Sequence, residues 1–253
     1  MLTFKTKDIE VVLNPKRGLA LDSAVFRRVS PKPLMGTLAH GYYDDIAFGA
    51  DFYTGHTLIE RFGKSKVTDL DEVKPRITTT KNGVIVKGSV RTPLGTIKKT
   101  WIIADSLELF CEFDLNNVPP APFYSGIVTL RPEAFDGNSL YYSCHNGGYQ
   151  PDIFSLRGVE RIDNAPVSFL VSSRYTLGNT EGICEIGDRH IAIRIENDMT
   201  KLAMLPRVHF VRMPNTFFLR VLFSLGEVDD TNMSREPRAV RSAFHITIRA
   251  SKK

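Results

Sequence analysis

Apolar and polar residues alternate at every second position over long stretches of this chain, and this pattern restricts the fold more than any other feature. In residues 83–91, for example, Val84, Val86 and Val90 share one side. Similar alternation runs through residues 96–104, 107–114, 190–198 and 217–225. Because successive side chains of a β-strand point to opposite faces, the pattern predicts a series of antiparallel strands.

Many short strands separated by turns indicate an all-β fold, a large antiparallel β-sandwich. The 253 residues, 42% of them hydrophobic, are enough to form one such core. We therefore expect a single domain over residues 1–253. Residues 116–122, rich in proline, are the best linker candidate, although a crossover between two sheets explains them equally well. Helical turns are expected only around residues 199–202 and 234–240.

Composition excludes several classes of protein. No stretch approaches the roughly 20 apolar residues that cross a bilayer, and the first residues do not resemble a signal peptide. The net charge of +5 comes from scattered Lys and Arg residues, which argues against nucleic-acid binding. Cys111, Cys144 and Cys184 are far apart and lie within apolar strand patterns. We interpret them as reduced, buried thiols of a cytoplasmic protein.

The beginning and the end of the chain resemble parts of a known fold. Residues 3–14 predict a strand pair that leads into Arg17-Gly18 and a further strand, while residues 182–188 and 218–226 predict late strands. This arrangement resembles the galactose mutarotase-like supersandwich, and in particular the C-terminal β-domain of family 57 and family 38 type glycoside hydrolases. The resemblance implies a carbohydrate-handling module. In those enzymes the catalytic carboxylates belong to a separate barrel, so the resemblance carries over no hydrolytic pair.

Residues 40–56 break the alternation and are rich in aromatic, acidic and imidazole side chains. Aromatic rings stack on the C–H faces of a pyranose, while Asp and His hydrogen-bond its hydroxyls. We therefore interpret this segment as a candidate sugar site. Its predicted substrate-binding residues are His40, Tyr42, Asp45, Asp51, Tyr53 and His56. The alternative is a long loop packed over the sandwich, with its Asp residues capping turns and its rings buried.

A second candidate combines two predicted strands. Tyr141 and His145 share one strand face, and Thr129, Arg131 and Glu133 share another. The resemblance adds that sugar-binding supersandwiches place Arg, His and Glu on their concave sheet, so Arg131 and His145 join the predicted sugar site. The alternative is a polar strand face that is simply exposed to solvent.

A third polar face is formed by His190, Arg194, Glu196 and Asp198. Opposite charges along one strand predict exposed ion pairs, and the set lacks the paired histidines of a zinc site. The sequence also lacks calcium-loop, phosphate-loop and nucleophile-elbow motifs. We therefore expect no metal and no cofactor.

These observations predict a carbohydrate-binding or accessory β-domain of the glycosidase type, without a hydrolytic centre of its own. Its expected partners are an oligosaccharide or polysaccharide and a separate catalytic glycosidase subunit. The first alternative is an aldose 1-epimerase-like isomerase, which needs an imidazole acid and a carboxylate base. The residues of these types are His56, His145 and His190, and Glu133, Glu196 and Glu227. His56, His145 and Glu133 are the catalytic candidates, and a protein-interaction sandwich is the second alternative.

Overall fold

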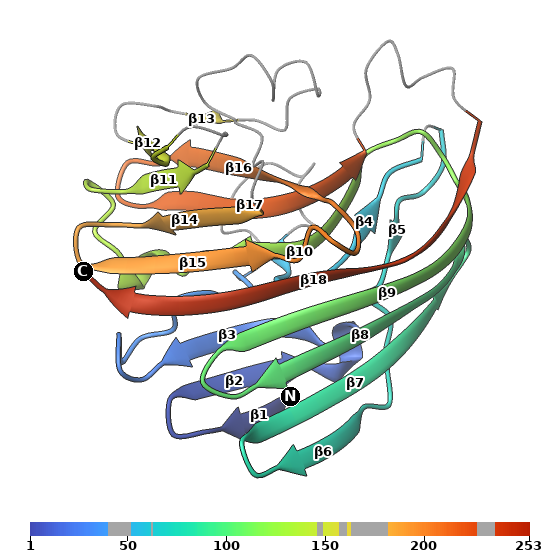
Figure 1. The fold of residues 1–253 in the computed structure, drawn as a ribbon, viewed down its shortest axis with the longest axis horizontal. Helices are drawn as coiled ribbons and strands as arrows, with labels where there is room; N and C mark the ends of the chain where they lie inside the picture. The colour runs from blue at the N-terminus through green and yellow to red at the C-terminus, as the bar shows by residue number, and fades with distance from the viewer. Residues whose placement is uncertain (40–51, 62, 146–148, 157–160, 163–181, 227–235) are drawn as a thin grey trace.

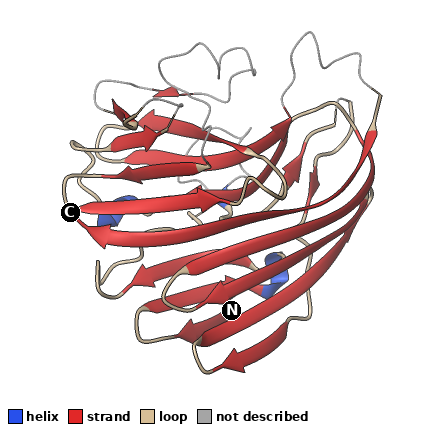
Figure 2. Cartoon of the chain, in the orientation of Figure 1, coloured by secondary structure: helices blue, strands red, loops and turns tan. Residues whose placement is uncertain are grey.

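The computed structural model describes residues 1–39, 52–61, 63–145, 149–156, 161–162, 182–226 and 236–253 (Figure 1). Apart from two short 3-10 turns, η1 (Pro15–Arg17) and η3 (Pro132–Ala134), the regular elements of these residues are strands (Figure 2). The strand pairs are antiparallel. The predicted all-β sandwich class is confirmed. In these ranges no helix is long and apolar enough to cross a membrane.

The largest sheet has nine strands and curves across the front of the molecule in Figure 1. In spatial order they are β12 (Asp152–Ser155), β11 (Tyr141–Cys144), β14 (Ile183–Gly187), β15 (Ile191–Asn197), β18 (Arg238–Lys252), β9 (Leu107–Val118), β8 (Gly95–Ile103), β7 (Gly83–Thr92) and β6 (Arg76–Thr80). Along β9, Leu109 and Cys111 are buried while Glu112 and Asp114 are exposed. This is the predicted period-two pattern, and it places one face of the sheet on the core.

Two smaller sheets complete the sandwich. One contains β1 (Leu2–Lys5), β2 (Ile9–Asn14) and β3 (Ala20–Phe26). The other has six strands, in the order β13 (Arg161–Ile162), β16 (Leu205–Arg212), β17 (Phe217–Gly226), β10 (Phe123–Thr129), β4 (Leu58–Ile59) and β5 (Val67–Thr68). β10 is buried at every position, so this central strand is covered on both faces of its sheet.

The three sheets share one hydrophobic core. Apolar residues of β2, β8, β9, β17 and β18 belong to a single cluster of buried side chains. The rings of Phe223 on β17 and Phe244 on β18 have centroids 5.3 Å apart, and Phe113 on β9 meets Phe123 on β10 edge to face at 5.2 Å. These contacts join the six-stranded sheet to the nine-stranded sheet through aromatic packing.

The proline-rich residues 116–122 connect the two large sheets. β9 ends at Val118 in the nine-stranded sheet, and β10 begins at Phe123 in the six-stranded sheet. The segment is therefore a crossover between sheets. A turn is present at residues 199–201, close to the predicted position.

The helical turn predicted at residues 234–240 is wrong from Arg238 onward. Residues 238–240 begin β18, where Arg238 lies opposite Val118 and Val240 lies opposite Leu115 of β9. Residues 234–235 lie outside the described ranges. Pairing with a long neighbouring strand decides the conformation here, because local propensity is a weak preference that tertiary contacts override.

Candidate functional site

One face of the six-stranded sheet carries large polar side chains that are fully buried. Along β16, Val208 and Phe210 belong to the core, so the alternating Arg207 and His209 point to the opposite side. Along β17, Arg220 alternates in the same way with core residues. We call the side of this sheet that faces away from the nine-stranded sheet the outer face. Arg207 is 1% exposed, and His209 and Arg220 are 0% exposed.

The register of the strands places these side chains in rows across the outer face. His209 lies directly opposite Arg220, and Arg220 lies directly opposite Thr129 of β10. In the next row Arg207 lies opposite Leu222, and its Nη1 donates a hydrogen bond of 3.2 Å to the Tyr124 hydroxyl. The Arg207 and Tyr124 side chains therefore meet across β17, which lies between β16 and β10.

Phe218 is the apolar centre of the outer face. The His209 ring meets it edge to face at 5.3 Å, and the Arg220 guanidinium lies 5.6 Å from its centroid. Phe52 meets the same ring edge to face at 5.8 Å. An aromatic platform bordered by an imidazole and a guanidinium can contact both the C–H groups and the hydroxyls of a sugar ring.

His56 lies at the β4 side of the same face. The Gly55 N–H donates to the Ile127 carbonyl at 2.7 Å, which continues the β4–β10 register up to His56. Thr57 points inward, where its hydroxyl lies 2.9 Å from that of Ser125. His56 therefore points outward by the alternation of the strand, and it is 0% exposed.

A buried ion pair on the inner side fixes the backbone that carries His56. Asp69 Oδ1 accepts the Thr57 N–H at 2.8 Å, and Asp69 Oδ2 lies 2.8 Å from Lys99 Nζ. Lys99 also donates to the Gly18 carbonyl at 2.8 Å. Such a pair is stable in the interior only when further hydrogen bonds complete it, as they do here.

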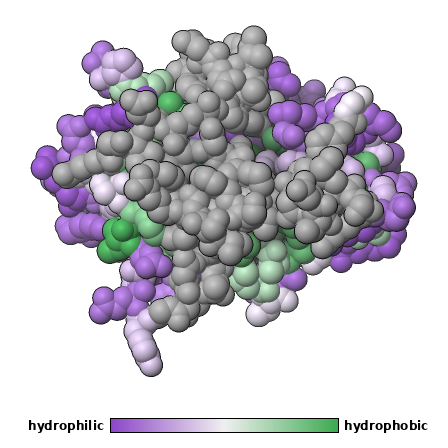
Figure 3. All heavy atoms as spheres, turned by 90° about the horizontal axis from the view of Figure 1, so that it is seen from above, coloured by the Kyte–Doolittle hydropathy of each residue, from purple (hydrophilic) through white to green (hydrophobic). Residues whose placement is uncertain are grey.

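The polar side chains of the outer face extend from β16 across β17 and β10 to the β4 side of the sheet. Three strand spacings separate the backbone at His56 from the backbone of β16, a span of about 14 Å. The hydrogen bond between the Arg207 guanidinium and the hydroxyl of Tyr124 bridges part of this span, because Tyr124 belongs to β10, the strand next to β4. In the view from above, the described residues at the edges of the molecule are mainly hydrophilic, with small hydrophobic patches between them (Figure 3).

Residues 40–56 are only partly described. His40, Tyr42, Asp45 and Asp51 lie outside the described residues. The Tyr53 and His56 rings meet edge to face at 6.4 Å, and the Arg17 guanidinium lies 5.9 Å from the Tyr53 centroid. Tyr53 is half-buried, so this end of the predicted segment lies beside the outer face through His56.

The second predicted candidate does not form the strand face that the sequence suggested. β10 ends at Thr129, and Glu133 lies in η3, so Thr129, Arg131 and Glu133 share no strand face. Arg131 donates to the Thr37 carbonyl at 2.7 Å and pairs with Glu133 at 2.9 Å. The strand breaks because Pro132 cannot continue the hydrogen-bond ladder. His145 directly follows β11 of the nine-stranded sheet, whereas His56 is carried by the six-stranded sheet.

The third polar face is the predicted surface of ion pairs. Glu196 pairs with Arg194 and with Arg249 of β18, each at 2.8 Å. These hydrogen bonds lower the pKa of Glu196, with Arg194 as the largest cause. His190 is exposed and accepts a hydrogen bond of 3.0 Å from Arg189. A carboxylate held in surface ion pairs is a poor general base, so this face does not supply one.

Sequence reasoning overlooked Arg207, His209 and Tyr124. The available signal was the polar side chains at positions 207 and 209 within an otherwise apolar strand. Arg220 lies within the alternating residues 217–225, but alternation alone does not distinguish a solvated face from a covered one.

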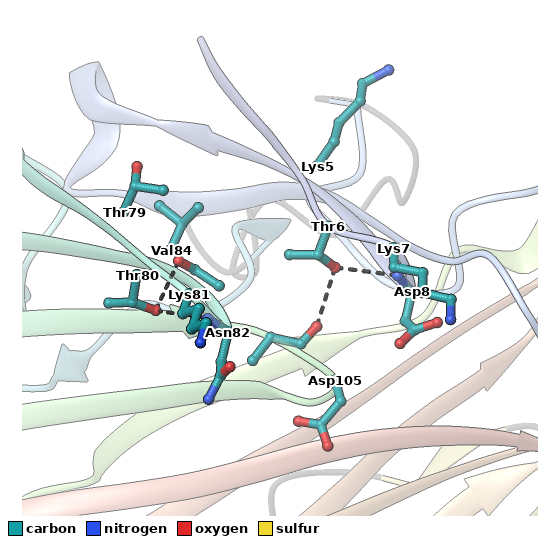
Figure 4. A pocket seen from close by; sticks show the side chains of 12 residues that line it. Lys5, Thr6, Lys7, Asp8, Thr79, Thr80, Lys81, Asn82, Val84 and Asp105 are labelled. Atoms are coloured by element: carbon teal, nitrogen blue, oxygen red, sulfur yellow. Dashed lines mark hydrogen bonds between the residues drawn. The ribbon is translucent and has the colours of Figure 1, made fainter.

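A separate surface pocket, of about 540 Å³, lies where three turns meet at residues 5–8, 79–84 and 104–105 (Figure 4). Thr6 donates to the Ala104 carbonyl and Thr80 to the Gly83 carbonyl, both at 3.1 Å, so the first hydroxyl joins two of the turns and the second closes one. Lys7, Lys81 and Asp105 are exposed. Because its polar groups are hydrated or already engaged in the turns, this pocket is a weaker candidate than the outer face.

The three cysteines are free and buried, as predicted. Burial raises the pKa of the Cys144 thiol to about 11 and that of Cys111 to about 12. These thiols are protonated at neutral pH, which argues against Cys144 as a nucleophile. Within the described ranges no group of three or more His, Cys, Asp or Glu side chains could hold a metal ion.

No protein-family model matches the sequence, and no curated protein matches it. A solved structure of a proposed mutarotase, YeaD from Salmonella typhimurium, is similar with a TM-score of 0.55. The similarity covers 99% of this chain and 90% of that chain at 10% sequence identity. The fold is that of the galactose mutarotase-like β-sandwiches. The predicted fold resemblance is therefore confirmed.

Two further structures are similar to this galactose mutarotase-like chain at lower TM-scores. A proposed aldose 1-epimerase from Klebsiella pneumoniae has a TM-score of 0.47 and 9% identity, over 99% of this chain and 78% of that chain. A 4-alpha-glucanotransferase from Thermococcus litoralis has a TM-score of 0.42 and 10% identity, over 98% of this chain and 37% of that chain.

Proposed function

We propose that this protein binds an aldose on the outer face of the six-stranded sheet and interconverts its two anomers. The observation that carries the proposal is the buried row of His209, Arg220 and Thr129 beside Arg207, Tyr124 and His56. The galactose mutarotase-like fold and its similarity to a proposed mutarotase support a sugar as the ligand. At this level of identity the fold alone is shared, so the activity rests on the site.

Anomer exchange requires acid and base catalysis at two neighbouring oxygens. A base removes the proton of the anomeric hydroxyl while an acid protonates the ring oxygen, and the C1–O5 bond breaks to give the open-chain aldehyde. Rotation about C1–C2 and the reverse proton transfers close the ring with the other configuration. His209 and His56 are the imidazoles of the outer face, and we assign the acid to one of them. Arg207, Arg220 and Tyr124 would hold the sugar hydroxyls.

The carboxylate base of this reaction comes from outside β10, β16 and β17, because these strands contain no Asp or Glu. Of the predicted bases, Glu133 and Glu196 are held in ion pairs at the surface. Glu227, which follows β17 directly in the sequence, lies outside the described residues, as do Asp45 and Asp51. We propose Glu227 as the first base to test, by a Glu227→Gln substitution.

The absence of carboxylates from these three strands also favours a second candidate, a carbohydrate-binding domain without catalysis. In that case the outer face holds an oligosaccharide and the chemistry belongs to a separate glycosidase subunit. Both candidates use the same outer face. They differ only in whether bound sugar exchanges its anomers faster than free sugar.

Optical rotation distinguishes the two candidates. Fresh α-D-glucose and α-D-galactose are followed with and without the protein, and calorimetric titration measures binding of the same sugars. Acceleration by the wild-type protein that is lost in Arg220→Leu supports the epimerase. Millimolar or tighter binding without acceleration supports the binding domain. Neither acceleration nor binding for these aldoses and for maltose oligosaccharides contradicts the proposal as a whole.

A further inference from the structure

Two of the three cysteines face each other in the nine-stranded sheet. Cys144, the last residue of β11, is the direct partner of Cys184 on β14. Their exposed fractions are 2% and 1%, and both thiols are free. The third cysteine, Cys111, lies on β9, three strands away from β14.

The hydrogen bonds between β11 and β12 show whether Cys144 and Cys184 are a hydrogen-bonded or a non-hydrogen-bonded pair. Leu156, next to β12, donates its N–H to Leu140 at 3.0 Å, and this pair continues the β11–β12 register. Residues 140, 142 and 144 therefore direct their backbone N–H and C=O groups toward β12. Because these groups alternate along a strand, residue 144 makes no ladder hydrogen bond to β14.

Cys144 and Cys184 are consequently a non-hydrogen-bonded antiparallel pair. In such pairs the Cα atoms are about 4.5 Å apart and the side chains approach each other most closely. Disulfides span Cα distances of about 4.4–6.8 Å. The backbone of β11 and β14 therefore already has a separation at which the two sulfurs can bond.

We propose that Cys144 and Cys184 form a redox-active dithiol, which a small-molecule disulfide such as oxidised glutathione converts into a cross-strand disulfide. The thiolate of Cys144 attacks oxidised glutathione, forms a mixed disulfide and releases one glutathione thiolate. The thiolate of Cys184 then attacks the Cys144 sulfur and releases the second glutathione. Two protein thiols are oxidised and one glutathione disulfide is reduced to two glutathione thiols, which take up the two protons that the protein thiols lose.

The position of Cys144 makes it the first of the two thiols to react with oxidised glutathione. Cys144 lies at the end of β11, and β12 beside it is a four-residue edge strand with three exposed positions. Short edge strands open locally at a small free-energy cost, which exposes the strand behind them. Burial raises the pKa of Cys184 further than that of Cys144, so Cys144 is the better attacking thiol. Oxidation is expected to be slow at neutral pH and faster as the pH rises toward 9.

The experiment incubates the full chain with oxidised and reduced glutathione at fixed ratios and measures its intact mass and its tryptic peptides. The expected product lacks two hydrogen atoms and contains one linkage, between the peptides of Cys144 and Cys184. Cys111→Ser should form the same product. Cys144→Ser and Cys184→Ser should not form it, and Cys184→Ser should accumulate a glutathione adduct on Cys144.

A second measurement does not depend on the folding of the serine variants. Phenylarsine oxide, which bridges two neighbouring thiols, should bind the reduced wild-type protein in a 1:1 ratio and block the later oxidation. A wild-type protein that keeps three free thiols in excess oxidised glutathione at pH 9 overturns the proposal. A linkage that involves Cys111, or an adduct on Cys144 that never resolves, also overturns it.

Discussion

His209 of β16 and Arg220 of β17 are direct cross-strand neighbours, and both side chains are 0% exposed on the face of their sheet that turns away from the main core. Burying an imidazole beside a guanidinium costs free energy that apolar residues at the same positions would not cost. The proposed ligand-binding role accounts for polar residues at these positions.

A substitution of Arg220 should therefore weaken sugar binding while the protein stays folded. Arg220→Leu is expected to leave the protein folded, because Leu fills a similar volume beside Phe218. Sugar binding should fall at least tenfold. Arg194→Leu, on the exposed face of β15, is the matched control and should change binding by less than twofold. A strong loss of stability without loss of binding would assign Arg220 a purely structural role.

Gly55 should tolerate no side chain, for a reason beyond its backbone angle. Its φ is +76°, and an added Cβ would lie 2.4 Å from a ring atom of Trp101. Gly63 has a similar φ of +66° but nothing within 4 Å of an added Cβ. Gly63→Ala should cost about 1 kcal/mol, the strain of a left-handed alanine. Gly55→Ala should cost clearly more in urea unfolding and should also weaken sugar binding, because His56 is the next residue.

The Asp69–Lys99 pair should show strong coupling in a double-mutant cycle. Removing one partner leaves a buried charge, so Asp69→Asn and Lys99→Met are each expected to cost about 3–5 kcal/mol. The double variant should recover part of this loss. Glu60→Gln, which breaks the exposed pair of Glu60 with Lys66, should cost less than about 1 kcal/mol. Additive losses at Asp69 and Lys99 would mean that the pair contributes no coupling.

Alkaline pH should destabilise the protein through its buried thiols. The pKa of Cys111 is raised from 9.0 to about 12, so the unfolded chain loses this proton at a lower pH than the folded chain. The stability contributed by the neutral thiol is complete below pH 9 and is lost as the pH rises toward 12. The unfolding free energy of Cys111→Ala should therefore fall less steeply with pH than that of the wild-type protein, by about 1.4 kcal/mol per pH unit in this window. An unchanged slope would contradict the assignment.

The fold could be predicted from the sequence because alternation reports which strand face meets the core. The strands predicted at residues 83–91, 96–104 and 107–114 correspond to β7, β8 and β9. The crossover at residues 116–122 could not be separated from a linker, because the sequence does not state which sheet a strand joins. The prediction of a helical turn at residues 234–240 was wrong from Arg238 onward for a related reason. Arg238 pairs with Val118 of β9, which is far away in the sequence.

The candidate site was harder to predict than the fold. Arg207 and His209 alternate with Val208 and Phe210, a pattern that a solvated strand also shows. Arg207 and His209 differ from the residues of a solvated strand because the outer face is buried, and this burial depends on contacts between distant segments. His56 was identified from the composition of its segment. Arg131 and Glu133 were predicted to share a strand face with Thr129, but β10 ends at Thr129 and Glu133 lies in η3.

Magnetisation-transfer NMR of an equilibrated aldose tests most directly whether the outer face of the six-stranded sheet catalyses anomer exchange. The wild-type protein should increase the α-to-β exchange rate of glucose or galactose in proportion to its concentration. His209→Gln or His56→Gln should lower this rate at least tenfold, since general acid catalysis contributes about 10²–10⁴-fold. His190→Gln, at the exposed turn before β15, should leave the rate unchanged. A wild-type rate equal to that of buffer for every aldose tested, or a rate unaffected by both outer-face substitutions, would contradict the account.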